Sequence, residues 1–240
     1  MIQQGQRVTL AVHPCRVSQG LLGAVQGVWA RLQALGVTVL CLFMDREFYQ
    51  VAILRYLKAV LDVPFCMAAP QKGSPEGEGL KALALQQPPG IYSYAVRSPK
   101  EGAVEVSVAV VGRYLKGRWN RHERVRYTYV LHRFPWAFTT IHGKYRSRFG
   151  MESSYRLKEQ TRARTTSPSS ALRLLWVAVA LVLQNVWVWL QWACVARPRR
   201  GGRQILYRWF SFFRMRQFLQ QAIEEMYQLV ESVNLAPRSP

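Results

Sequence analysis

Acidic residues are scarce in this 240-residue sequence. It holds 13 Asp and Glu against 33 Lys and Arg, a net charge of +20, and its only aspartates are Asp45 and Asp62. That excess indicates a polyanionic partner, with nucleic acid first and an anionic membrane surface second. A merely soluble basic surface is the plainer alternative, and a charge of this size makes it the weaker one.

Clustered cysteines and metal-ligand spacings are also lacking. The four cysteines are scattered, no Cys-x2-Cys pair or Cys/His cluster occurs, and the four histidines have no zinc spacing. We therefore expect reduced, structural cysteines, as is usual in the cytoplasm. The first residues, Met-Ile-Gln-Gln-Gly-Gln-Arg, contain no apolar segment, so no signal peptide is visible. The expected location is cytoplasmic.

The first 69 residues alternate between two hydrophobic patterns. Apolar, β-branched runs are typical of buried strands, and apolar residues at helical spacing predict amphipathic helices. The predicted order is a strand at 7–12, a helix at 19–35, a strand at 37–44, a helix at 47–60 and a strand at 63–69. This alternation predicts an α/β core over residues 1–69.

The rest of the chain divides by composition into three parts. Residues 70–134 predict a β-rich insertion, because a polar loop precedes strand-like runs at 91–97, 103–112 and 126–132. From about residue 135 the apolar spacing is helical. Helices are expected at 136–160 and 171–196, within a region 135–196 that completes the core, and at 203–233, within a basic helical tail 197–240.

Two carboxylates occupy positions that suit metal-dependent phosphoryl transfer. Asp45 ends the apolar run 37–44, and Glu152 belongs to Tyr145-x2-Arg148-x3-Glu152, whose three side chains fall on one face of a helix. Carboxylates so placed suit two Mg²⁺ ions, which activate a water or a 3′-hydroxyl at a phosphodiester. The plainer alternatives are a helix cap for Asp45 and an ordinary surface acid for Glu152.

These residues, in this order of elements, resemble the ribonuclease H-like catalytic domain of bacterial insertion-sequence DDE transposases. The helical motif matches most of that family's Y-x2-R-x3-E-x6-K signature, and the resemblance covers about residues 7–195. It implies a DNA transposase that cleaves and joins insertion-sequence ends with two Mg²⁺ ions. Asp45 and Glu152 would be catalytic residues and metal ligands, and Tyr145 and Arg148 would contact transposon-end DNA.

The resemblance is incomplete at two positions. The signature Lys is replaced by Glu159, and Lys158 beside it is the substitute candidate for DNA contact. The family's first catalytic Asp has no counterpart, because no acidic residue precedes Asp45. We therefore expect a partial ribonuclease H-like core from an N-terminally truncated transposase, with its third metal ligand missing and no activity alone. A non-catalytic DNA-binding remnant that modulates an intact transposase is the alternative.

Two basic segments are further candidates for DNA contact. Residues 113–126 carry six basic residues, one acid and two aromatics, among them Arg118, Trp119 and Arg121. Such loops clamp phosphates and stack on bases, although a solvated hairpin tip is the alternative. Residues 197–216 carry seven Arg and no acid, which indicates a DNA-facing turn or a general basic surface. The expected partners are transposon-end DNA and a second transposase copy in a homodimer.

A membrane span is the remaining alternative. Residues 174–196 form a run of 23 uncharged residues that includes four Trp, and Arg flanks both ends. Gln184, Asn185 and Gln191 lie within the run and argue against a span. The resembled family places a very apolar helix after its catalytic helix, packed on the core. We therefore expect a buried helix, and a basic single-span membrane protein is the less favoured interpretation.

Overall fold

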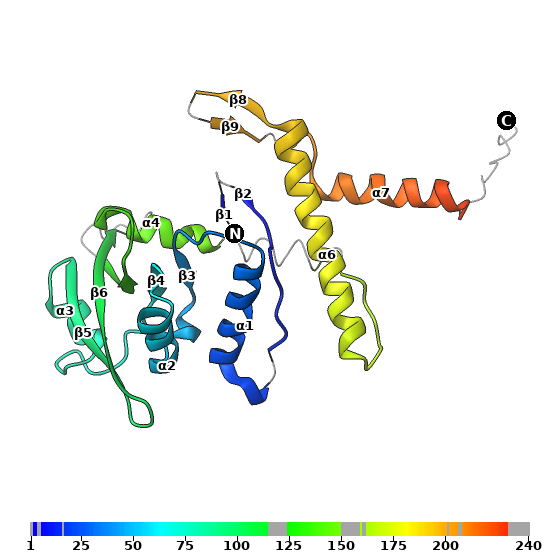
Figure 1. The fold of residues 1–240 in the computed structure, drawn as a ribbon. Coiled ribbons are helices and arrows are strands. Elements are labelled where there is room, and N and C mark those ends of the chain that lie inside the picture. Colours follow the sequence, from blue (N-terminus) through cyan, green and yellow to red (C-terminus); the bar gives the residue numbers. More distant parts are fainter. Residues whose placement is uncertain are drawn as a thin grey trace, which may run out of the picture. The chain divides into compact units, whose positions relative to one another are not determined.

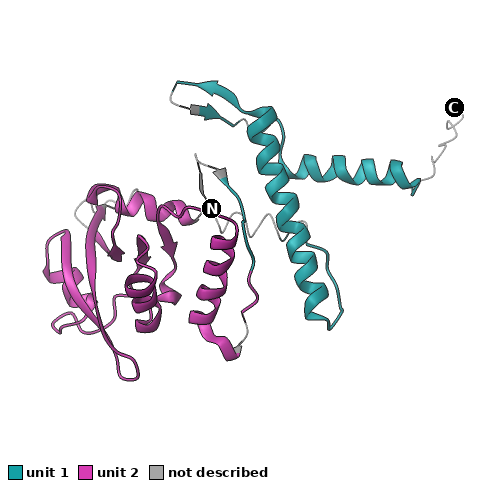
Figure 2. Ribbon diagram, in the orientation of Figure 1, with its two compact units in different colours: residues 1–12, 150–240 teal, residues 13–149 magenta. Residues whose placement is uncertain are grey.

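The chain folds as two compact units. Unit 1 contains residues 1–12 and 150–240, and unit 2 contains residues 13–149 (Figure 2). The computed structural model describes residues 2–3, 6–15, 17–114, 124–149, 159, 162–200, 202–205 and 208–229.

A mixed β-sheet organises unit 2 (Figure 1). Its strand order is β3-β4-β7-β6-β5; β3 and β4 run parallel, and every other neighbouring pair is antiparallel. The predicted α/β class is therefore confirmed, whereas the ribonuclease H-like topology stays a prediction. The strands are β3 (Leu42–Met44), β4 (Phe65–Ala68), β5 (Gly90–Ser98), β6 (Gly102–Tyr114) and β7 (Arg124–His132).

The helices of unit 2 follow the apolar spacing at most positions. The helix predicted at 19–35 forms, and Gly36 ends it with a φ of 64°, a left-handed value that glycine adopts without strain. A short helix inside the expected 70–90 loop was not predicted. The helices are α1 (Gly20–Ala34), α2 (Val51–Arg55, continued by a π turn over Tyr56–Val60), α3 (Leu80–Gln86) and α4 (Ile141–Arg146).

Apolar side chains cover both faces of the sheet. On one face, Phe65 and Val108 pack with Ile53 of α2 in a single buried cluster. On the other face, Tyr129 and Ile141 belong to a second cluster that includes α4. Successive strand residues point to opposite faces, so β4, β6 and β7 supply side chains to both clusters. The core therefore fixes α4 against the sheet.

The strand predicted at 37–44 is much shorter in the structure. Only β3 (Leu42–Met44) pairs with β4, and the Leu42 N–H donates to the Pro64 carbonyl. Pro64 has no N–H to donate, so it cannot extend the ladder toward residue 37. In the described part of the chain, β3 stands at one edge of the sheet.

Unit 1 departs from the sequence prediction near its N-terminal end. The strand expected at 7–12 is replaced by a short hairpin of β1 (Ile2–Gln3) and β2 (Gln6–Arg7), followed by chain without a strand ladder. The Asn185 side chain accepts from the Thr9 N–H at 2.8 Å and donates to the Thr9 carbonyl at 2.6 Å. A side-chain amide thus supplies the partners that a neighbouring strand would otherwise give.

Two helices and a hairpin form the rest of unit 1. These are α6 (Ser170–Leu190, continued by a π turn over Gln191–Val195), β8 (Arg197–Arg199), β9 (Gly202–Gln204) and α7 (Phe212–Tyr227). The helix predicted at 203–233 begins only after Ser211, whose hydroxyl accepts from the Arg214 N–H. Trp187 and Gln191 both donate to the Phe210 carbonyl, which joins α6 to the start of α7.

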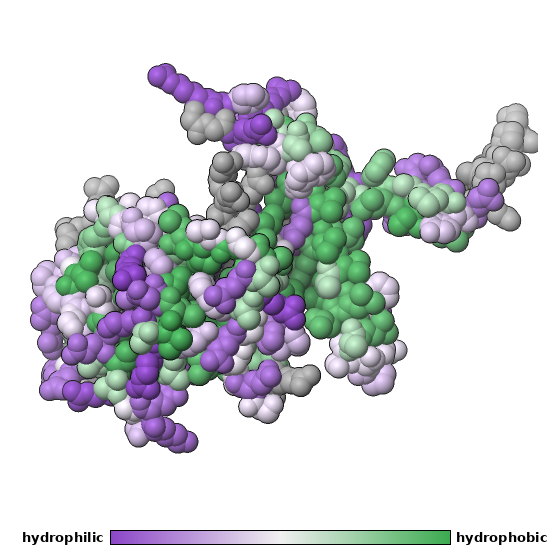
Figure 3. Space-filling model, viewed as in Figure 1, coloured by the Kyte–Doolittle hydropathy of each residue, from purple (hydrophilic) through white to green (hydrophobic). Residues whose placement is uncertain are grey.

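Apolar side chains are exposed along α6, and Figure 3 shows them as a green surface. Within the described residues, one helix is long enough and apolar enough to cross a membrane, and it covers Ser170–Val195. Only 22% of its most apolar stretch is buried. Length and composition alone are nevertheless weak evidence for a membrane span, since core helices of soluble proteins pass the same test.

The buried cluster around α2 carries a stability prediction. Ile53 is fully buried, so Ile53→Ala should lower the free energy of unfolding by about 2–5 kcal/mol through lost burial and a cavity. Leu85→Ala is the control, because Leu85 is 51% exposed and its loss should change stability by less than about 0.5 kcal/mol. Urea denaturation measures both. Equal effects of the two substitutions would contradict this packing.

Candidate functional site

Asp45 lies directly after β3, at the carboxyl end of the only parallel strand pair in the described sheet. It begins a short 3-10 turn, Arg46–Phe48, and its Oδ1 accepts from the Arg46 N–H at 2.7 Å. The capping role that the sequence allowed is therefore present. The cap uses only Oδ1, and the side chain remains 43% exposed, so Oδ2 can make a different contact.

Arg148 contacts that second oxygen. Its Nη1 lies 3.3 Å from Asp45 Oδ2, and its side chain is only 10% exposed. Arg148 belongs to a 3-10 turn, Ser147–Phe149, that directly follows α4. The two residues are 103 positions apart in the sequence, so the contact depends on the packing of α4 against the sheet. A largely buried guanidinium thus neutralises a half-exposed carboxylate in this arrangement.

Tyr145 connects α4 to the end of β3. It is 5% exposed, and its hydroxyl donates to the Met44 carbonyl at 3.1 Å. Its ring lies 4.9 Å from that of Tyr129, and the Arg148 guanidinium lies 5.3 Å from its centre. Burial raises the pKa of the Tyr145 phenol, which keeps it protonated as a donor. Tyr145 therefore positions the backbone next to Asp45 and the side chain of Arg148.

Five of the predicted site residues lie outside the described part of the chain: Glu152, Lys158, Arg118, Trp119 and Arg121. Glu159 is exposed, and its Oε2 lies 3.5 Å from Arg162 Nη2. It therefore stands beside a basic partner where the resembled signature has Lys.

Asp45 is a suitable ligand for a hard cation such as Mg²⁺, which prefers carboxylate oxygens. Its Arg148 contact is a competitor, because a cation at Oδ2 would have to displace the guanidinium. Among the residues that the structure describes, no group of three His, Cys, Asp or Glu side chains could hold a metal ion. Within these residues, the Asp45 carboxylate therefore offers one possible ligand for a metal ion.

A second polar contact on α4 was not predicted from the sequence. The Tyr129 hydroxyl and His142 Nδ1 are 2.7 Å apart, and the Tyr127 ring lies 4.5 Å from the imidazole. Burial lowers the pKa of His142, and the nearby Arg113 and Arg146 lower it further. His142 precedes Tyr145 by three positions, and this one-turn spacing is the signal that could have linked it to the site.

Comparisons with known proteins do not assign the chain. No family model matches it, and no curated protein matches it significantly. The transposase resemblance therefore remains a hypothesis carried by the motif residues and by the contacts among Asp45, Tyr145 and Arg148.

The Tyr145 hydrogen bond can be tested by removing one oxygen. Tyr145→Phe keeps the ring but leaves the Met44 carbonyl without this donor, so it should cost about 1 kcal/mol of unfolding free energy. Tyr92→Phe is the control, because the Tyr92 hydroxyl donates to the Pro88 carbonyl at an exposed position where water can replace it. Chemical denaturation should show the larger loss for Tyr145→Phe. A larger loss for the control would refute the positioning role.

His142 predicts a pH dependence of stability. Its pKa is lower in the folded state than the ordinary value of 6.5, so the folded protein favours the neutral ring. The contribution of the neutral His142 ring to the free energy of unfolding is complete above the unfolded-state pKa, and it is lost as pH falls through the lower folded-state pKa. Unfolding free energies measured between pH 7 and pH 5 should therefore decrease less steeply in His142→Gln than in the wild type. Parallel profiles would show that His142 is not the responsible group.

Proposed function

We propose that the chain belongs to a DNA phosphoryl-transfer system of the DDE transposase type, acting on insertion-sequence ends in the cytoplasm. The supporting observation is the contact of Asp45 with Arg148, together with the bond from Tyr145 to the residue before Asp45. Two motifs, 100 residues or more apart in the sequence, meet at the end of a parallel strand. The net charge of +20 supports DNA as the substrate.

Each motif residue has a distinct proposed role. Asp45 and Glu152 would hold Mg²⁺, which when bound activates a hydroxyl nucleophile and stabilises the leaving oxygen of a phosphodiester. Arg148 would exchange its contact with Asp45 for the DNA phosphate, because a guanidinium binds either anion through paired N–H groups. Tyr145 would act as a positioning residue, since its hydroxyl is bonded to the Met44 carbonyl.

The same observations favour a second function for this chain on its own. No acidic residue precedes Asp45 in the sequence, and Arg148 already neutralises its carboxylate. A DNA-binding protein that does not cleave, and that modulates an intact transposase by sharing its DNA sites or its homodimer, needs neither two metal ions nor a third carboxylate. We therefore propose that the isolated chain binds DNA without cutting it.

A single-span membrane protein is less well supported. Two of the three polar residues within the apolar helix are used inside unit 1: Asn185 bonds to Thr9, and Gln191, which is 2% exposed, bonds to the Phe210 carbonyl. These contacts tie α6 to non-helical segments of the same unit rather than leaving its surface uniformly apolar.

Mn²⁺ binding tests the metal role without requiring activity. In electron paramagnetic resonance titrations, Asp45→Asn should weaken Mn²⁺ binding by about tenfold or more, because a direct ligand is lost. Arg148→Ala should strengthen binding, because it removes the competing cation. Asp62→Asn is the matched control, since Asp62 is the only other aspartate and contacts His132 and Arg133 instead.

The wild-type chain should leave supercoiled plasmid intact in the presence of Mg²⁺. Equal Mn²⁺ binding by the wild type and Asp45→Asn would refute the metal role of Asp45. Mg²⁺-dependent nicking that Asp45→Asn abolishes would instead show that the chain is active alone, against the non-cleaving function.

A further inference from the structure

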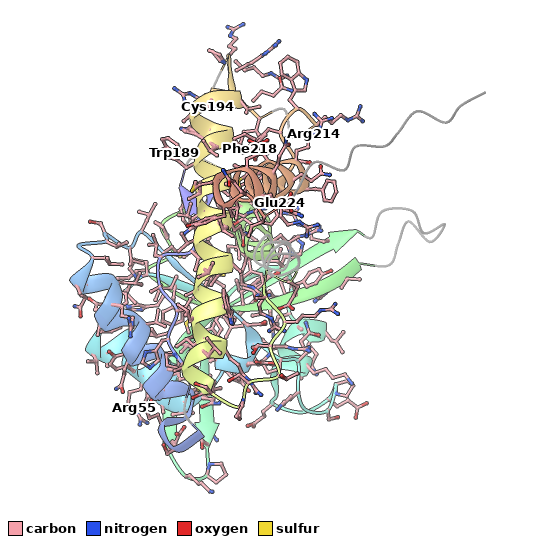
Figure 4. All side chains as sticks on the ribbon, turned by 90° about the vertical axis from the view of Figure 1, so that its right-hand side faces the viewer. Arg55, Trp189, Cys194, Arg214, Phe218 and Glu224 are labelled. Atoms are coloured by element: carbon pink, nitrogen blue, oxygen red, sulfur yellow. The ribbon has the colours of Figure 1, made fainter. Side chains whose placement is uncertain are left out.

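Unit 1 carries a long stretch of sequence with positive charge only. Residues 160–223 contain ten Arg and no Asp or Glu. The next acids, Glu224 and Glu225, lie in the last turn of α7 and accept hydrogen bonds from Gln220 and Gln221. Figure 4 looks along α7 and shows Arg214, Phe218 and Glu224 projecting from it. Positive charge is therefore concentrated in the segment that precedes α7 and in its first turns.

Four of these arginines belong to the β8–β9 hairpin and its turn. The strands pair Arg197 with Gln204, Pro198 with Arg203 and Arg199 with Gly202. Every residue of β8 is exposed, and Arg200 follows it at the turn. The sequence allowed a DNA-facing turn or a general basic surface, whereas the structure gives a two-stranded ribbon with basic side chains on both strands.

Tryptophan rings hold two of these arginines in place. The Arg197 guanidinium lies 4.4 Å from the centre of the Trp209 ring. The Arg203 guanidinium lies 5.1 Å from the Trp192 ring, and its Nη1 donates to the Trp192 carbonyl at 3.2 Å. A cation–π contact restrains a guanidinium beside the ring. These side chains are therefore ordered before they meet a ligand, which reduces the entropy lost on binding.

We propose that the β8–β9 hairpin, with Arg214 beside it, binds the phosphate backbone of duplex DNA without sequence preference. Arg214 donates to the Trp209 carbonyl and so belongs to the same surface as Arg197. A two-stranded ribbon has the dimensions of the major groove, and planar guanidiniums bind phosphate through paired N–H groups. The surface lies wholly in unit 1, whereas Asp45 belongs to unit 2.

A lipid surface fits these observations less well. Membrane-bound tryptophans insert their rings at the interface, but Trp192 and Trp209 each have one ring face occupied by a guanidinium. The arginines also lie on both strands of the ribbon and on α7, a spread that matches the two phosphate strands flanking a groove.

The test measures binding of the full chain to a labelled 30-base-pair duplex of arbitrary sequence by fluorescence anisotropy. EDTA is present throughout, so metal binding at Asp45 does not contribute. Arg197→Ala/Arg203→Ala should weaken binding about tenfold or more near 0.1 M salt. The logarithm of the association constant falls as the logarithm of the salt concentration rises, and the magnitude of this slope should drop by about 1.8, because each of the two lost phosphate contacts contributes about 0.9. Arg199→Ala/Arg200→Ala, which leaves both arginine–tryptophan contacts intact, should also weaken binding and reduce the magnitude of the slope.

The matched control is Arg31→Ala/Arg97→Ala, which removes the same charge from exposed positions in unit 2. It should leave the salt slope unchanged, and circular dichroism should show that all variants are folded. Equal weakening by the hairpin and control variants would overturn the proposal. So would hairpin variants that keep duplex binding but lose binding to phosphatidylserine vesicles. Because EDTA is present throughout, failure of this proposal would leave the proposed metal role of Asp45 untouched.

Discussion

The packing of α4 against the end of β3 is the constraint on which the candidate site depends. Tyr145 reaches the Met44 carbonyl, and the following turn places Arg148 on Asp45. Neither contact is local in sequence, so both require the buried cluster in which Tyr129 and Ile141 join the helix to the sheet. The hydrogen bond and the ion pair then fix a carboxylate and a guanidinium at the end of β3, as the proposed phosphoryl-transfer function requires.

Patterns that repeat over several residues predicted the fold well. The strands at 91–97, 103–112 and 126–132 and the helix at 19–35 form with small changes in their ends, because alternation and helical spacing report which face is buried. The errors have tertiary causes. Pro64 shortens β3 by giving its neighbour no donor, and Asn185 takes the hydrogen bonds of the segment expected as a strand at 7–12.

The candidate site was predictable only in part. The spacing of Tyr145 and Arg148 predicted one helix over 136–160 that carries both residues, but α4 ends at Arg146 and Arg148 lies in the 3-10 turn that follows. The spacing also gave no sign that Tyr145 would be buried and bonded to the backbone beside Asp45. The Tyr129–His142 contact joins residues of different elements and had no sequence signal beyond helical spacing. The contact of Arg197 with the Trp209 ring likewise depends on a hairpin that the helical pattern of 203–233 did not predict. Such contacts are set by packing between elements, which a linear pattern does not encode.

In the proposed function, Asp45 and Glu152 are ligands of one metal site. Iron-directed cleavage tests it most directly, because Fe²⁺ can occupy Mg²⁺ sites and, with ascorbate and peroxide, cuts the backbone nearby. Mass spectrometry of the fragments should locate cuts beside Asp45 and within the segment around Glu152, and excess Mg²⁺ should suppress both. Cuts confined to other segments, or cuts at Asp45 that persist unchanged in Asp45→Asn, would contradict the account.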